Sequence, residues 1–270
     1  MDAQTNYRRD VDSRPLFFNR MGRGRTGGST FLDIMVQRML AEKRPVMIAD
    51  GDLKNPTLSK LYPDGTGFPV ERPGSLDLAD VKEWILSIMG LASERRATLV
   101  LDLGGGDRVM GDLSAELQVA AVALELGLVP VGLYFTGVEQ DDLIHVHNLV
   151  EAGAFKADRQ ILIVNESLVP AGKTAQNVVV PFTQTEAFVS LCSRGVESLR
   201  FPRLMMLEKI RAAGLTINEV LSHPKRSDVM RIGITMPLVI RDFQKKLDVA
   251  IEESEVHDLF PRFTMPEVVS

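Results

Sequence analysis

Residues 21–31 read MGRGRTGGSTF and come shortly after the short apolar run PLFFN at residues 15–19. Gly22, Gly27 and Gly28 give this stretch the length and glycine placement of a phosphate-binding loop between a strand and a helix. Glycines let successive backbone N–H groups point inward, and the N-terminus of the helix adds partial positive charge. Gly28 stands where such a loop carries its lysine, so the stretch predicts an anion site with a missing or relocated cation. A tight turn that merely enters a helix is the alternative.

Apolar runs that end at glycine- or acid-rich turns alternate with helix-like stretches on both sides of this loop. Strands are expected at residues 16–19, 44–50, 97–103, 128–137 and 159–167. Helices are expected at residues 29–43, 75–93 (capped by Ser75), 115–127 and 138–153. Continuously apolar strands are typical of parallel sheets covered on both faces. The pattern therefore predicts an α/β fold: a doubly wound, mostly parallel sheet flanked by helices, with ligands at the carboxyl ends of its strands.

The second half of the chain has a less regular pattern. Residues 62–75 are broken repeatedly by proline and glycine, which predicts an irregular excursion. Residues 177–182, NVVVPF, are compatible with a strand, and residues 201–222 indicate helices or a helix-turn-helix. A long amphipathic helix is expected after Pro237. We expect one domain over residues 15–270 with a helical C-terminal region, preceded by a flexible arm at residues 1–14.

Composition and charge narrow the classes of function. A net charge of -5 and a pI near 5.5 argue against a surface covered with positive charge for nucleic acid, although a local or dimer-assembled basic patch stays open. Cys192 is the only cysteine, which excludes an intramolecular disulfide and a cysteine metal cluster. No apolar segment reaches the length of about 20 residues that a membrane span needs. The polar start has no apolar signal region, so we expect a cytoplasmic protein.

Two further strand ends carry residue types suited to nucleotide chemistry. Asp50 and Asp52 flank a glycine directly after the second expected strand, and Asp102 precedes a run of three glycines after the third. Together with Ser29 at the end of the glycine loop, these groups supply the hydroxyl and carboxylate oxygens that Mg²⁺ prefers. Taken singly, the acidic turn could be a solvated turn and Asp102 a simple cap. Three such motifs at the ends of parallel strands favour a nucleotide site.

In this order and spacing, the motifs resemble those of the ParA/MinD family of deviant Walker ATPases over about residues 15–170. The loop of that family has the form K-G-G-x-G-K-[ST]-T. Aligned to it, Arg23 replaces the signature lysine at the start and Arg25 replaces the second glycine. Gly28 replaces the usual lysine, so one cation becomes arginine and the other is absent.

The resemblance implies a P-loop NTPase fold and a set of nucleotide contacts. Those contacts come from the loop residues Gly22, Gly24, Arg25, Thr26, Gly27, Gly28, Ser29 and Thr30. By the same resemblance Asn165, after a late strand, reads adenine; a strand that simply ends in asparagine is the alternative. The implied cofactors are ATP, or ADP, and Mg²⁺.

The resemblance also implies metal and catalytic roles. Ser29 would bind Mg²⁺, Asp50 would support the metal shell, and Asp102 would hold the ion through water. Asp52 would position or activate the attacking water, and Arg23 would act in catalysis across a homodimer that encloses ATP.

The function implied by the resemblance is a nucleotide switch, a weak ATPase whose output is an interaction with a regulatory or transfer-machinery protein. The loop, the acidic turn and the glycine-rich strand end look most like the divergent TraL- or StbB-like branch, which implies plasmid transfer or maintenance. A degenerate pseudo-ATPase scaffold is the rival: Gly28 supports it, and the retained carboxylates oppose it. An ATP-dependent metal-insertion or redox relative is disfavoured by the lone Cys192.

Overall fold

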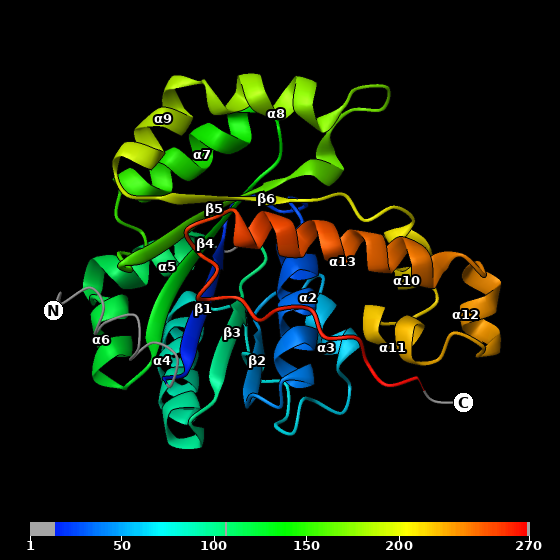
Figure 1. The fold of residues 1–270 in the computed structure, drawn as a ribbon. Coiled ribbons are helices and arrows are strands. Elements are labelled where there is room, and N and C mark those ends of the chain that lie inside the picture. The colour runs from blue at the N-terminus through cyan, green and yellow to red at the C-terminus, as the bar shows by residue number, and fades with distance from the viewer. Residues whose placement is uncertain (1–13, 106, 269–270) are drawn as a thin grey trace, which may run out of the picture.

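The computed structural model describes residues 14–105 and 107–268, so the expected arm at residues 1–14 lies, apart from Arg14, outside the described residues. Six strands form one sheet in the order β2-β3-β1-β4-β5-β6, and all neighbouring pairs are parallel (Figure 1). The strands are β1 (Leu16–Met21), β2 (Val46–Asp50), β3 (Thr98–Asp102), β4 (Val129–Thr136), β5 (Arg159–Asn165) and β6 (Glu197–Phe201). This confirms the predicted doubly wound parallel sheet.

Helices cover both faces of the sheet, as parallel connections require. One face is packed by α2 (Gly28–Ala41), α3 (Thr57–Leu61), α10 (Leu207–Ala212), α11 (Ile217–Ser222), α12 (Ser227–Ile232) and α13 (Met236–Glu252). The other is packed by α4 (Leu78–Arg95), α5 (Asp107–Glu116), α6 (Val119–Glu125), α7 (Gln140–Glu151), α8 (Ala175–Thr183) and α9 (Glu186–Ser193). A single 3₁₀ turn, η1 (Glu166–Leu168), follows β5.

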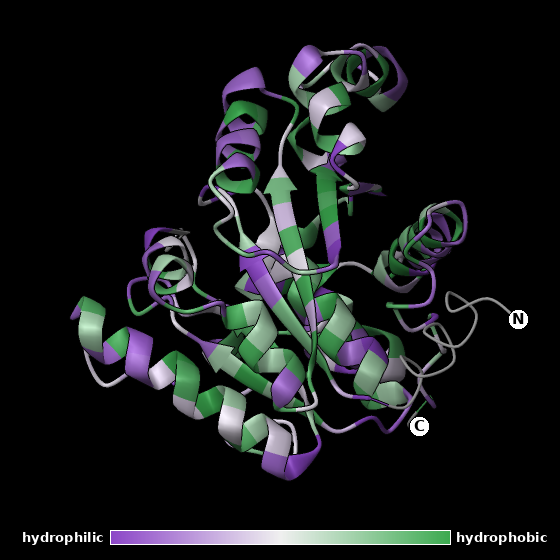
Figure 2. Ribbon diagram, turned by 90° about the vertical axis from the view of Figure 1, so that its left-hand side faces the viewer, coloured by the Kyte–Doolittle hydropathy of each residue, from purple (hydrophilic) through white to green (hydrophobic). Residues whose placement is uncertain are grey.

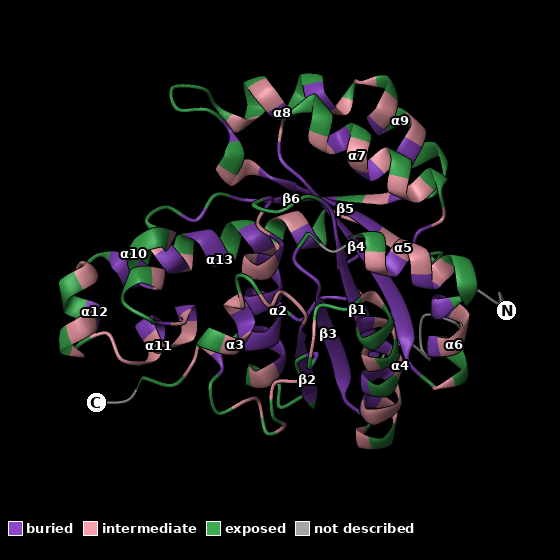
Figure 3. Ribbon diagram, turned by 180° about the vertical axis from the view of Figure 1, so that it is seen from behind, coloured by how far each residue is buried: buried purple, intermediate pink, exposed green. Residues whose placement is uncertain are grey.

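The hydrophobic core is divided by the sheet, because successive side chains of a strand point to opposite faces. In β1, Leu16 and Phe18 belong to the cluster on the α2 side, whereas Phe17 and Met21 belong to the opposite cluster. Figure 2 shows apolar residues in the sheet and polar ones on the outer sides of the helices, and Figure 3 shows the strands buried between the two helical layers. None of the helices in the described part of the chain combines the length and apolarity that a bilayer crossing requires.

Helix α2 is tied to the C-terminal region by buried polar contacts. Arg38 donates to Oε1 of Gln244 at 2.6 Å and to Asp248 at 2.8 Å, both on α13. Asp33, fully buried, accepts from Arg211 of α10 at 2.8 Å and from the Tyr62 hydroxyl at 2.7 Å. The helix that follows the glycine loop is therefore positioned by residues from the second half of the chain.

In the second half of the chain, one expectation is wrong and one strand was not predicted. Residues 177–182 do not form a strand but lie in α8, where the Thr174 side chain caps the helix by accepting from the Asn177 N–H. The buried residues of this helix, Val179 and Phe182, are three apart, which is helical spacing. Strand β6 was not predicted: as an edge strand it alternates polar and apolar residues, with Glu197 and Arg200 half-buried or exposed.

Three helix boundaries also differ from expectation. Helix α4 is capped by Asp77 rather than Ser75, whose hydroxyl instead accepts from the Asp77 N–H. The expected helix at residues 115–127 is two helices, α5 and α6, separated at residues 117–118. Helix α13 starts at Met236, with Pro237 in its first turn, where the missing N–H of proline is tolerated.

Candidate functional site

The glycine loop connects β1 to α2 at the carboxyl edge of the sheet. Gly22 has a φ of 117°, and a Cβ there would lie 2.5 Å from the carbonyl oxygen of Phe135, so no other residue fits without movement. Arg25 has a φ of 67°, a left-handed conformation that disfavours side chains by about 1–2 kcal/mol. Residue 25 therefore has a backbone conformation that glycine adopts without strain, although it is an arginine.

The start of α2 borders a cavity of about 950 Å³ at the carboxyl edge of the sheet, which we call the loop cavity. Gly24, Arg25, Gly27, Gly28, Ser29 and Thr30 all line it. Gly27 precedes the helix without a side-chain cap, and the first turn carries no acidic residue. Backbone N–H groups and the positive end of the helix therefore face the cavity, an arrangement that favours an anion.

Ser29 and Asp102 are brought into contact from adjacent strand ends. The Ser29 hydroxyl donates to Oδ2 of Asp102 at 2.5 Å, although the two residues are 73 positions apart. Oδ1 of Asp102 accepts from the Gly104 N–H at 2.9 Å. Only 1% of Asp102 is exposed. A hydroxyl and a carboxylate held together at the start of α2 form an oxygen donor set suited to Mg²⁺.

Asp50, like Asp102, is buried and is not among the residues that line the loop cavity. It is fully buried, and its Oδ2 accepts from both the backbone N–H and the hydroxyl of Ser59, at 2.8 and 2.9 Å. Burial raises the pKa of this carboxyl, the hydrogen bonds from Ser59 oppose the shift, and nearby Asp102 adds to it. Asp50 thus holds the start of α3 in place.

Asp52 lines the loop cavity directly. Its Oδ1 accepts from the backbone N–H groups of Lys54 and Asn55, at 3.1 and 2.9 Å, which fixes the turn after β2. Its other oxygen lies against Gly104, on the turn after β3. The carboxylate is therefore oriented by its own turn and faces the glycine-rich turn of the neighbouring strand.

Arg23 and Thr26 belong to the loop but are not among the residues that line the loop cavity. The Arg23 side chain is 49% exposed and pairs with Asp142 of α7 at 3.5 Å. The Thr26 hydroxyl donates to the carbonyl oxygen of Arg23 at 2.7 Å, and only 2% of Thr26 is exposed. The loop is thus braced internally, while the Arg23 guanidinium extends toward α7 rather than into the cavity.

Asn165 joins the end of β5 to the loop. Its Nδ2 donates to the carbonyl oxygen of Thr26 at 2.9 Å, and its Oδ1 accepts from the Ser167 N–H at 2.9 Å. The residue also lines the loop cavity. An amide group has two N–H donors and two acceptor lone pairs, so one of each remains for a ligand.

Two cations at the loop cavity were not expected from the sequence. Arg20, the fifth residue of β1, and Lys54, in the acidic turn, both line the cavity. Lys54 is exposed, but only 3% of Arg20 is exposed. The signal for Arg20 was present: a charged residue within an apolar strand is rarely buried without a partner. From the second half, Phe201, Leu204, Leu207 and Glu208 add an outer wall.

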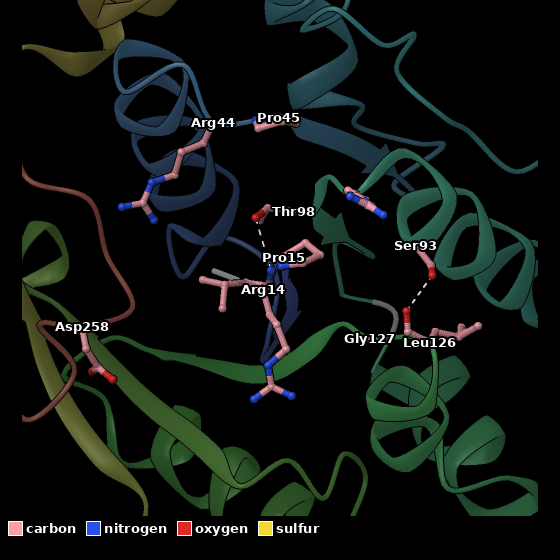
Figure 4. Close-up of a pocket in the computed structure, with 11 residues that line it drawn as sticks. Arg14, Pro15, Arg44, Pro45, Ser93, Thr98, Leu126, Gly127 and Asp258 are labelled. Carbon is pink, nitrogen blue, oxygen red and sulfur yellow. Dashed lines mark hydrogen bonds between the residues drawn. The ribbon is translucent and has the colours of Figure 1, made fainter. Parts of the chain in front are cut away.

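A second cavity, of about 600 Å³, lies at the opposite edge of the sheet, where the strands begin. Its lining includes Arg14, Arg44, Arg96 and Asp258. Arg14 and Arg44 extend in different directions (Figure 4). We call this the amino-edge cavity.

Comparisons with known proteins add little to this geometry. No family model matches the chain, and no curated protein matches it. Among solved structures, the chain is similar to the crystal structure of a ParA family ATPase from Chlorobium tepidum TLS, with 12% sequence identity and a TM-score of 0.46. The match covers 84% of this chain and 98% of that one. The α/β fold class therefore rests on the sheet order and the loop geometry described above.

Proposed function

We propose that this chain is a nucleotide-dependent switch that binds ATP with Mg²⁺ in the loop cavity. The contact between the Ser29 hydroxyl and the Asp102 carboxylate carries the proposal. These are the two oxygen donors of a phosphate-loop metal site, and they meet at the uncapped start of α2. The resemblance of the three motifs to ParA/MinD ATPases points the same way.

The donor set fits Mg²⁺ better than a metal that needs an all-protein cage. In the described ranges, no group of three or more His, Cys, Asp or Glu side chains gathers to hold a metal ion. Mg²⁺ is commonly bound by one or two protein oxygens, with phosphates and waters completing its shell. Ser29 would bind the ion, Asp102 would hold its water, and Asp50 would support this shell through the turn after β2. The bound ion would neutralise phosphate charge.

Hydrolysis is proposed to be weak and to depend on Asp52, whose oriented carboxylate faces the loop cavity. Asp52→Ala should slow turnover while nucleotide affinity stays unchanged, as measured by phosphate release and by titration. Equal loss of both would place Asp52 in the metal shell instead.

The proposed active form is a homodimer in which Arg23 reaches the partner's nucleotide. In the single chain Arg23 pairs with Asp142, and exposed ion pairs of this kind contribute only about 0–1 kcal/mol. Breaking the Arg23–Asp142 ion pair on dimerisation therefore costs little free energy. Arg23→Glu should abolish nucleotide-dependent dimerisation in light scattering; undiminished dimerisation would remove this role.

The biological setting rests on the motif resemblance alone. It suggests a cytoplasmic protein of plasmid transfer or maintenance, of the TraL- or StbB-like branch, whose nucleotide state controls a regulatory or transfer-machinery protein. The choice of ATP over GTP rests on the proposed reading of adenine by Asn165.

The deciding experiment is calorimetric titration of the full chain with ATP, with and without Mg²⁺. We expect saturable binding that Mg²⁺ strengthens. If ATP does not bind at millimolar concentration, the proposed switch is refuted. The pseudo-ATPase scaffold is then the favoured function, in agreement with the absence of the loop lysine at Gly28.

A further inference from the structure

Arg20 is a buried cation beneath the glycine loop whose hydrogen bonds are incomplete. Its Nη2 donates to the carbonyl oxygen of Arg23 at 2.7 Å and lies 3.4 Å from the Thr26 hydroxyl. Its Nε and Nη1 are buried and have no hydrogen-bond partner among the described residues. Leaving buried donors unpaired is costly, and more so for a charged group. Such a group at the wall of a cavity indicates that a ligand completes its bonding.

The position of Arg20 explains why residue 28 is glycine. A Cβ on Gly28 would lie 2.3 Å from Nε of Arg20 and 2.9 Å from its Cγ. The space that a lysine side chain would enter from the start of α2 is already filled by the arginine side chain. A lysine at position 28 is therefore incompatible with the observed conformation of Arg20. The absence of the loop lysine and the burial of Arg20 thus depend on each other.

The location of Arg20 follows from the alternation of β1. Arg20 has the parity of Leu16 and Phe18, which pack on the α2 side of the sheet. Its guanidinium carbon lies 6.0 Å from the centre of the Phe135 ring. This aromatic contact and the two loop contacts hold the guanidinium under the loop.

We propose that Arg20 binds the phosphates of the nucleotide in place of the loop lysine, supplied from the strand before the loop instead of the helix after it. The inference rests on the proposed nucleotide-binding function. A guanidinium stays protonated and offers several donors in one plane, which suits bidentate phosphate contacts. Nη2 braces the loop, and Nε and Nη1 are the donors left for phosphate oxygens. The ligand class is a polyphosphate anion.

The test is a swap of the cation between the two positions. ATP and inorganic tripolyphosphate are titrated, each with Mg²⁺, into wild type, Arg20→Ala, Gly28→Lys and the double variant. Arg20→Ala should weaken both ligands by about 10- to 100-fold, the range for losing charged hydrogen bonds. Gly28→Lys alone should not tighten binding, because Arg20 occupies its space. The double variant should recover most of the loss.

Two further variants separate phosphate binding from a purely structural role. Arg20→Gln keeps a polar side chain at this position but carries no charge, so it should bind as weakly as Arg20→Ala. Arg14→Ala removes the same charge just before the other end of β1 and should bind like wild type. Thermal unfolding of each variant shows that it is folded.

Each result decides between the two proposals. If Arg20→Gln binds like wild type, or if the double variant stays as weak as Arg20→Ala, Arg20 is not the phosphate cation and nucleotide binding still stands. If tripolyphosphate binds but ATP does not, the proposed nucleotide switch is refuted. The tripolyphosphate affinities of the Arg20 and Gly28 variants still test the role of Arg20. If wild type binds neither ligand, both proposals are overturned.

Discussion

The two cavities lie at opposite edges of the same sheet, and both contain arginines. At the amino edge, Arg44 forms an ion pair with Glu42 at 2.6 Å, and Asp258 forms one with Arg159 at 2.8 Å. Arg96 is the C-cap of α4. At the loop cavity, Arg20 is almost fully buried and has two unpaired nitrogens.

Helix direction explains the difference. In a parallel α/β fold the helices that follow the strands start at the carboxyl edge and end at the amino edge, so their positive ends gather at one edge and their negative ends at the other. At the amino edge, Arg44 and Arg96 follow the C-termini of α2 and α4, whose negative ends complement them, and Arg14 has one buried nitrogen, Nε, without a hydrogen-bond partner among the described residues. Arg20 sits beside a positive helix end and has two unpaired nitrogens, the kind of donors that a bound anion would satisfy. The number of cations in a cavity is therefore a weaker sign of a ligand site than unpaired donors beside a helix N-terminus.

Among the variants that compare the two cavities, the largest effect on ATP affinity is expected from removing the carboxylate of the proposed metal site. Asp102→Ala should lower Mg²⁺-dependent ATP affinity by about 10- to 100-fold, the usual range for a group that orients the metal shell. The measurement is ATP titration with Mg²⁺ and with EDTA. Asp112→Ala, which removes a surface carboxylate on α5, is the matched control. An unchanged Mg²⁺ dependence would contradict the proposed metal site.

A smaller effect is expected for the amide that holds the loop. Asn165→Ala removes a hydrogen bond to Thr26, worth about 1 kcal/mol, so ATP and tripolyphosphate affinities should both fall about fivefold. Asn148→Ala, an exposed asparagine on α7, serves as control. If the ATP-to-GTP preference changes while tripolyphosphate binding does not, Asn165 reads the base and does not brace the loop.

At the amino edge, Asp258→Asn should leave nucleotide affinity unchanged and lower stability. Burial alone raises the pKa of Asp258, but two hydrogen bonds and the charge of Arg159 outweigh it, so the folded pKa lies below 3.8. The carboxylate therefore stabilises the fold above this pH and loses that effect as the pH falls through its folded pKa. Urea unfolding at pH 7 should show a loss of about 1–3 kcal/mol. The loss should shrink at pH 3, and an equal loss at both pH values would refute the ionic origin.

The smallest effect is expected at Arg96, an exposed residue with a left-handed φ of 50°. Arg96→Gly should raise the free energy of unfolding by up to about 1 kcal/mol, since glycine adopts this conformation without strain. Nucleotide affinity should not change. A loss of affinity comparable to that of Arg20→Ala would mean that the amino-edge cavity is a ligand site after all.

The sheet and the meeting of Ser29 with Asp102 could be predicted from the sequence because both depend on local patterns. Continuous apolar runs indicate buried parallel strands, and parallel strands bring Ser29 and Asp102 to one edge. Arg20 could not be assigned in this way, because its role depends on the approach of Gly28 from another element. The tie from Asn165 to the loop depends on strand order for the same reason. Strand β6 and helix α8 were missed because burial from other elements decides their conformation.

The bond from Asn165 to Thr26 spans 139 positions of the chain. The loop is therefore not a self-contained module, since its final shape requires β5 to have joined the sheet. During synthesis, a nascent chain in which the glycine loop has emerged but β5 has not contains the loop residues without the hydrogen bond from Asn165. The loop cavity is thus completed only after β5 has left the ribosome, so a product truncated before β5 lacks the bond that holds the carbonyl oxygen of Thr26.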